Sequence, residues 1–122
     1  MKKLVLFVVS TFLLLMMPQA TAANQVIRIT APLYQTFTGE FRNDGLAQLL
    51  TPSGELGLKV FQPVAKNRTW VIDAALIDQV IVMSNEYTLA TAAEPAGKEI
   101  ATSWITQLKR VTAGNDVVAL AY

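Results

Sequence analysis

Two short apolar runs constrain the fold more than any other feature of this sequence. The first is Trp70-Val71-Ile72, which ends at Asp73 and leads directly into a segment with helical periodicity. The second is the run Asp116-Val-Val-Ala-Leu-Ala-Tyr122 at the C-terminal end of the sequence. Apolar runs without alternation are typical of strands that are apolar on both faces, as in parallel sheets covered by helices. A strand, a helical segment and a second such strand form a βαβ unit, so the sequence predicts an α/β fold.

The remaining elements follow from hydrophobic periodicity and turn residues. The β-branched residues over positions 26–31 predict a first strand. The predicted helical segments cover residues 45–50, 55–65, 74–83 and 96–111. Ile100, Trp104 and Leu108 share one face of the last of these helices, so we expect Trp104 to be buried against the sheet. This order predicts a short parallel sheet of about three strands with covering helices.

The N-terminal segment has the three parts of a secretory signal peptide. Lys2 and Lys3 form a basic start, and residues 4–17 are an almost unbroken apolar run that ends at Pro18. Small residues in Ala20-Thr21-Ala22 provide a cleavage site before Ala23. An uncleaved anchor is the alternative, but an apolar run of about 14 residues is short for a membrane-spanning helix. We therefore expect an exported protein, secreted or envelope-associated, with a signal peptide at 1–22 and an α/β module at 23–122.

The composition of the expected mature chain excludes several classes of function. Without Lys2 and Lys3, eight basic residues remain against nine acidic ones, so the net charge is −1. Such a chain lacks the basic stripe of a nucleic-acid-binding protein, and we expect no nucleic-acid partner. The sequence has no Cys, which excludes a disulfide scaffold in an exported protein. It also has no His, and no Gly-rich phosphate loop or nucleophile elbow, so we expect no metal site and no cofactor.

Asp73 is the first candidate for a functional side chain. It follows a predicted parallel strand, and α/β proteins place their ligands and chemistry at the C-terminal ends of such strands. A carboxylate there could act as a base, a nucleophile or a metal ligand. The alternative, which we favour, is that Asp73 caps the following helix by accepting backbone N–H bonds.

Three further polar residues follow the first predicted strand. Glu40, Arg42 and Asp44 would lie at the same edge as Asp73 if the sheet is parallel. Carboxylates paired in this way would suit glycoside hydrolysis. The alternative, again favoured, is a solvated loop in which Asp44 is the N-cap of the next helix.

Several stretches of the chain resemble one family of exported proteins. They are R-N-D-G-L-A-Q-L-L-T-P-S-G at 42–54, W-V-I-D-A-A-L-I at 70–77, Tyr87, W-I-T-Q-L at 104–108 and D-V-V-A-L-A-Y at 116–122. Together they resemble the extracytoplasmic region of an actinobacterial family of unknown function, over about residues 26–122. The departures are Ala74 and Ala121, where proline is usual in the family.

This resemblance implies a barrel-like architecture. Family members are longer, and their barrel-like region is similar to polysaccharide deacetylase and glycoside hydrolase (β/α) barrels. The resemblance therefore implies that this chain corresponds to the N-terminal part of a larger protein and forms a partial barrel.

Two functional hypotheses follow. In the first, the chain is an exported α/β module without complete catalytic machinery that associates with a polysaccharide or protein partner of the cell envelope. Three strands would leave a sheet edge and part of one face open, so self-association through that edge also belongs to this hypothesis. In the second, the chain is part of a carbohydrate-active enzyme, similar to a polysaccharide deacetylase or glycoside hydrolase, that a missing C-terminal region completes.

Overall fold

The fold is built on a three-stranded parallel sheet. The computed structural model describes residues 25–62 and 67–121, so the predicted signal peptide at 1–22 lies outside the described residues. The strands are β1 (Gln25–Ile29), β2 (Arg68–Asp73) and β3 (Asp116–Leu120), and their order in the sheet is β1-β2-β3. Both pairings are parallel, which confirms the predicted α/β class.

Four described helices connect the strands. They are α2 (Gly45–Leu50), α3 (Glu55–Phe61), α4 (Ala74–Asn85) and α5 (Lys98–Thr112). Each corresponds to a predicted helical segment, although α5 begins two residues later than predicted. The left-handed Gly114, with φ of 78°, follows α5 and turns the chain toward β3, as expected for a residue that ends a helix.

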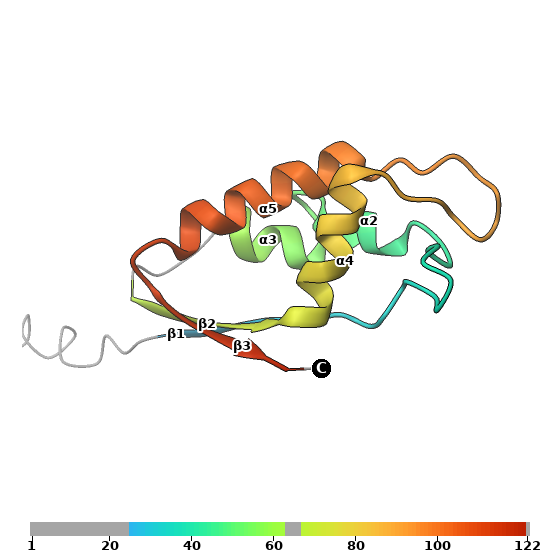
Figure 1. The fold of residues 1–122 in the computed structure, drawn as a ribbon. Coiled ribbons are helices and arrows are strands. Elements are labelled where there is room, and N and C mark those ends of the chain that lie inside the picture. Colours follow the sequence, from blue (N-terminus) through green and yellow to red (C-terminus); the bar gives the residue numbers. More distant parts are fainter. Residues whose placement is uncertain (1–24, 63–66, 122) are drawn as a thin grey trace, which may run out of the picture.

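The helices all lie on one side of the sheet, in two tiers (Figure 1). Helix α3 packs on β1 and α4 packs on β2, while α5 lies across α4, α3 and α2. Sequential strand order with helices on a single face is the arrangement of consecutive units in a (β/α) barrel. A doubly wound sheet would instead change its strand order and place helices on both faces.

Among the residues that the structure describes, one face of the sheet is therefore covered and the other is open. The pairing register places Ile29 beside Ile72, on the face that packs against the helices, and both are buried. On the opposite face, Val71 lies between Arg28 and Val118, and Val118 is 49% exposed. The expectation that the helices cover one face well is confirmed, but the expectation that they also cover part of the other face is wrong, because all four described helices lie on the same side.

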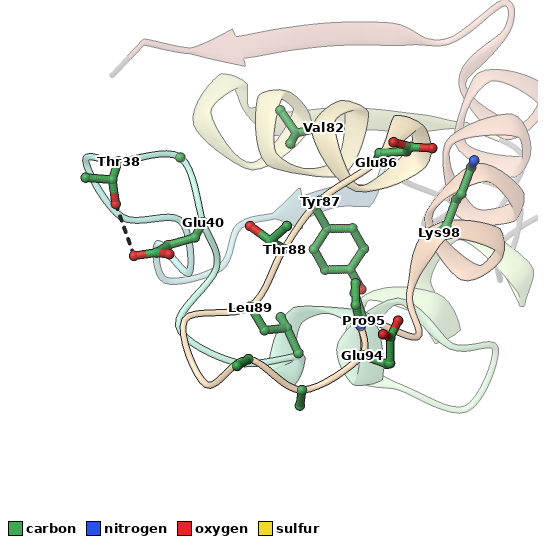
Figure 2. A pocket seen from close by; sticks show the side chains of 13 residues that line it. Thr38, Glu40, Val82, Glu86, Tyr87, Thr88, Leu89, Glu94, Pro95 and Lys98 are labelled. Carbon is green, nitrogen blue, oxygen red and sulfur yellow. Dashed lines mark hydrogen bonds between the residues drawn. The ribbon is translucent and has the colours of Figure 1, made fainter.

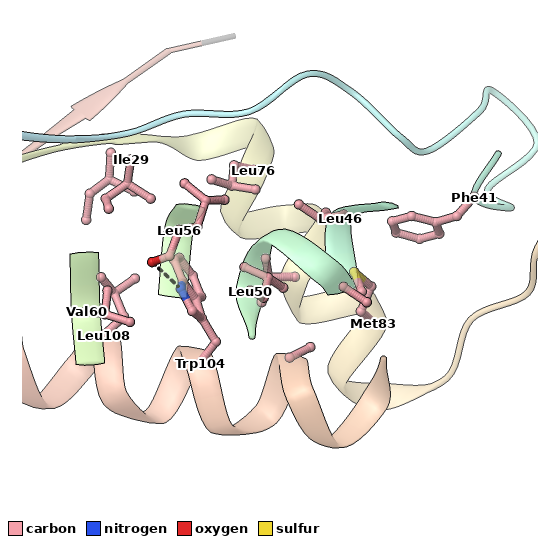
Figure 3. Close-up of a cluster of buried hydrophobic side chains, with 14 of the residues drawn as sticks. Ile29, Phe41, Leu46, Leu50, Leu56, Val60, Leu76, Met83, Trp104 and Leu108 are labelled. Atoms are coloured by element: carbon pink, nitrogen blue, oxygen red, sulfur yellow. Dashed lines mark hydrogen bonds between the residues drawn. The ribbon is translucent and has the colours of Figure 1, made fainter. Parts of the chain in front are cut away.

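The hydrophobic core fills the space between the covered face and α5 (Figure 3). Trp104 is fully buried, and its indole N–H donates to the Leu56 carbonyl of α3 at 3.0 Å. The prediction that Trp104 is buried is confirmed, but its hydrogen-bonded neighbour is a helix rather than the sheet. The two-tier stacking of helices accounts for this difference.

A glycine allows α3 to approach the turn that follows α2. A Cβ atom on Gly57 would lie 1.6 Å from the Thr51 carbonyl oxygen, which is a severe backbone clash. The same glycine lowers helix propensity, so the sequence alone predicts only a weaker helix at this point. The structure shows that the close packing of the α2–α3 pair requires a residue without a side chain.

Candidate functional site

Asp73 lies at the C-terminal end of β2 and caps α4. Its Oδ1 accepts a hydrogen bond from the Ala75 backbone N–H at 2.9 Å, and the side chain is half-buried. The local pattern of an aspartate before Ala-Ala-Leu therefore produces the cap that the sequence predicts. This bond leaves the second carboxylate oxygen available, so the cap and a polar role at the sheet edge are compatible.

Asp44 holds two distant loops together instead of capping α2. Its Oδ1 accepts from the Tyr87 hydroxyl at 2.5 Å, and its Oδ2 accepts from the Ala96 N–H at 2.8 Å. Asp44 occupies the N-cap position of α2, but its side chain makes no cap bond there. The Gly45 N–H donates instead to the side-chain oxygen of Asn43 at 2.8 Å. The expectation that the Asp44 side chain caps this helix is therefore wrong, because both oxygens have partners in the 86–97 loop.

Tyr87 is the centre of this network. Its hydroxyl donates to Asp44 and accepts from the Gly97 N–H at 2.7 Å, and its ring packs edge-on against Phe41 with centroids 5.1 Å apart. Burial raises the pKa of the Tyr87 phenol above its usual value, and the hydrogen bond to the Asp44 carboxylate and its negative charge add to the effect. The phenol is thus held in its neutral form, which suits a structural hydrogen bond and not a nucleophile.

Glu40 lines an open recess of about 870 Å³ between the 38–40 turn and the 86–98 segment (Figure 2). Its Oε1 accepts from the Thr38 hydroxyl at 3.1 Å. Glu86, Glu94 and Lys98 also line this recess, so its rim carries three carboxylates and one amine. Within residues 25–62 and 67–121, however, no group of three or more acidic side chains is close enough to hold a metal ion.

Arg42 lines a different recess. Its guanidinium donates to the Leu33 carbonyl, and the recess also includes Ala75, Asp78 and Gln79. Gln79 is buried, and its side-chain oxygen accepts from the backbone N–H of Tyr34 at 2.8 Å. The four candidate side chains thus each form hydrogen bonds with different neighbours. These hydrogen bonds do not join Glu40, Arg42, Asp44 and Asp73 in one cluster.

Sequence reasoning missed the structural roles of Tyr87 and Gln79. Their partners lie 43 and 45 residues away along the chain, respectively. A polar residue on the apolar face of a predicted helix is the one local signal that points to Gln79, because a buried amide must be hydrogen-bonded. No local signal connects Tyr87 with Asp44.

The open face of the sheet carries apolar side chains that no described helix covers. They are Val26, Val71, Val118 and Leu120, of which Val26 and Val118 are 64% and 49% exposed. The register places Arg28, Asp73 and Asp116 on the same face, so the surface is mixed. The edge strand β3 is also exposed on its other face, where Val117 is 51% exposed. Exposed apolar side chains on an uncovered sheet are a candidate interaction surface.

A groove runs along the opposite edge of the sheet. It has a volume of about 600 Å³ and lies between β1 and α3, where it is lined by Val26, Ile27, Leu58 and Lys59 among others. The Lys59 ammonium donates to the Arg28 carbonyl of β1 at 2.7 Å.

None of the helices among the described residues is long and apolar enough to cross a membrane. No protein-family model, no curated protein and no solved structure matches the chain.

Proposed function

We propose that this chain is an exported, envelope-associated α/β module that functions by association and not by catalysis. The observation that carries the proposal is the open face of the sheet, where exposed Val26 and Val118 lie among polar side chains such as Arg28, beside two strand edges. The candidate carboxylates support the same proposal, because Asp44 is bonded through both oxygens to another loop and Asp73 caps a helix.

Binding to isolated cell-envelope fragments tests the proposal. The purified chain should cosediment with envelope fragments from its native host, and Val118→Lys should abolish this binding because it places a charge on the apolar surface. Ile81→Lys is the matched control, since Ile81 is 46% exposed but belongs to helix α4 and not to a strand. Equal binding of the two variants, or no binding of the unmodified chain, would contradict the proposal.

Export belongs to the same proposal. It is supported by the basic Lys2-Lys3 start, the apolar run and the small residues before Ala23. Mass spectrometry of the protein from its native host should find a mature N-terminus at Ala23, within a residue or two. A cytosolic protein that retains Met1 would refute this part of the proposal.

The alternative function is one part of a carbohydrate-active (β/α) barrel enzyme that further β/α units complete. The sequential strand order with helices on one face favours it, as does the position of Asp73 at the C-terminal end of β2. The resemblance to polysaccharide deacetylase and glycoside hydrolase barrels points in the same direction. Hydrolysis of acetylated or glycosidic polysaccharides that is lost in Asp73→Asn, with the fold intact, would support this alternative and refute a purely non-catalytic role.

A further inference from the structure

We infer that the sheet binds a second copy of this chain, with β3 of each copy pairing in parallel with β1 of the other. This inference rests on the proposal that the open face is an association surface, and it names a second copy of the chain, in place of an envelope component, as the partner of that face. Three strands from each copy would form a closed parallel barrel, with the open faces inside and the helices outside.

The strand order makes such a closure geometrically simple. Because the order is β1-β2-β3 and all pairings are parallel, the two outer edges of the sheet belong to β1 and β3. A two-fold axis parallel to the strands brings β3 of one copy against β1 of the other and repeats the contact on the opposite side. Both edges of both sheets are then paired, which removes the exposed backbone groups that an open sheet leaves.

The β1 edge is shaped to receive a strand. The Gln25 N–H donates to the Asn67 carbonyl at 3.0 Å, so the peptide groups of Gln25 point toward the chain that precedes β2. Since peptide groups alternate in direction along a strand, those of Val26 and Arg28 point outward into the groove beside α3. The Lys59 ammonium donates a hydrogen bond to the Arg28 carbonyl. Because the lysine side chain is flexible, the N–H group of an incoming strand can replace it as the donor.

Strand β3 has the matching apolar surface. Val117 and Val118 point to opposite faces of the sheet and are 51% and 49% exposed. In the proposed pairing, Val117 faces the groove side, where Leu58 of the other copy is 44% exposed. Val118 lies on the inner side with Val26, which is the most exposed apolar residue of the sheet face.

The charges of the two edges are complementary. The exposed Asp116 is the first residue of β3, whereas Arg28 lies near the end of β1 and Lys59 donates to its carbonyl, so these charges meet when the closing strands are staggered, as strands in a barrel are. Pairing of β1 with the β1 of another copy would bring these basic groups together, which is unfavourable. Pairing of β3 with β3 would leave the groove beside β1 empty, so the β3–β1 contact is the arrangement that uses both edges.

Sedimentation equilibrium tests the proposed dimer. The protein is expressed as the full chain and purified with the N-terminus that the host leaves. The unmodified protein should show a reversible monomer–dimer equilibrium, and Val118→Lys should raise the dimer dissociation constant by about tenfold or more, because two charges enter the closed interior. Ile81→Lys, at an exposed position of α4 and not on a strand, should leave the dissociation constant unchanged.

A charge exchange tests which edges meet. Asp116→Lys and Lys59→Glu should each weaken dimerisation, because either homodimer then carries two like-charged contacts. An equimolar mixture of the two variants should regain a dimer, since each β3–β1 contact in the mixed pair again joins opposite charges. Circular dichroism of each variant should show that the fold is intact, because Asp116 is exposed and Lys59 is only half-buried.

The outcomes separate this inference from the proposed function. A monomer that still cosediments with envelope fragments would overturn the dimer and leave the envelope association standing. A dimer that is insensitive to Val118→Lys, or variants that do not recover on mixing, would place the contact elsewhere and also overturn the inference. Larger polymers in place of a dimer would show that the edges pair without closing, which contradicts the two-fold arrangement.

Discussion

Replacement of Trp104 by alanine should be among the most destabilising single changes in this chain. Trp104 is fully buried between α5 and α3, and its indole N–H donates to the Leu56 carbonyl at 3.0 Å. Removal of a buried tryptophan side chain costs about 3–5 kcal/mol, a range that includes the cavity left behind. The total stability of a domain of this size is about 5–15 kcal/mol, so Trp104→Ala should remove a large part of it.

Urea unfolding followed by far-ultraviolet circular dichroism measures this effect. With a typical urea dependence of about 1–3 kcal/mol per molar, Trp104→Ala should lower the unfolding midpoint by about 1 M or more. Trp104→Phe keeps most of the apolar volume but loses the N–H donor, so its cost should be smaller, at about 1–2 kcal/mol. The difference between the two variants separates the packing contribution from the hydrogen bond.

Ser103→Ala is the matched control on the same helix. Ser103 is exposed, so this change should alter the free energy of unfolding by less than about 0.5 kcal/mol. If the midpoint of Trp104→Ala moved no more than that of Ser103→Ala, the two-tier packing of α5 over α3 would be refuted.

Three further predictions concern other parts of the fold. The pKa of Tyr87 is raised above its usual value of 10.0, so the stability that its neutral phenol provides is present below pH 10 and is lost as the pH rises further. Tyr87→Phe should therefore reduce the loss of stability at alkaline pH, as measured by thermal unfolding at a series of pH values. Gly57→Ala should lower the melting temperature measurably although alanine is the better helix former, because the new Cβ would clash with the Thr51 carbonyl; an unchanged or higher melting temperature would contradict this packing. Asp73→Ala should cost about 1 kcal/mol through loss of the α4 cap in urea unfolding, and an unaltered midpoint would show that the cap bond contributes nothing.

The parts of the fold that depend on local patterns could be predicted from the sequence. The apolar run at Trp70-Val71-Ile72 and the valines after Asp116 predict two strands of a parallel sheet, and the structure contains both. Asp73 and the helix after it are adjacent in the chain, so its capping bond also follows from the local sequence. Secondary structure and this cap depend on residues only a few positions apart.

The contacts of Asp44 could not be predicted in the same way. Its partners Tyr87 and Ala96 lie 43 and 52 residues further along the chain. The N–H groups of Ala96 and Gly97, just before α5, also donate to Asp44 and Tyr87, and Gly97 is the N-cap residue of the helix. These contacts join segments that are far apart in the chain, so local patterns do not indicate them.

The solvent accessibility of the open sheet face is the most direct test of the central claim. The sequence has no Cys, so Val118→Cys and Ile72→Cys each introduce a single thiol, one on the open face and one on the covered face. In dilute protein, the thiol at position 118 should react with a thiol-specific reagent nearly as fast as in the unfolded chain, while the thiol at position 72 should react much more slowly. Increasing concentrations of the protein or of envelope fragments should then protect position 118. If position 118 were protected at every dilution, a part of the same chain would already cover this face, and the surface could not serve as an interaction site.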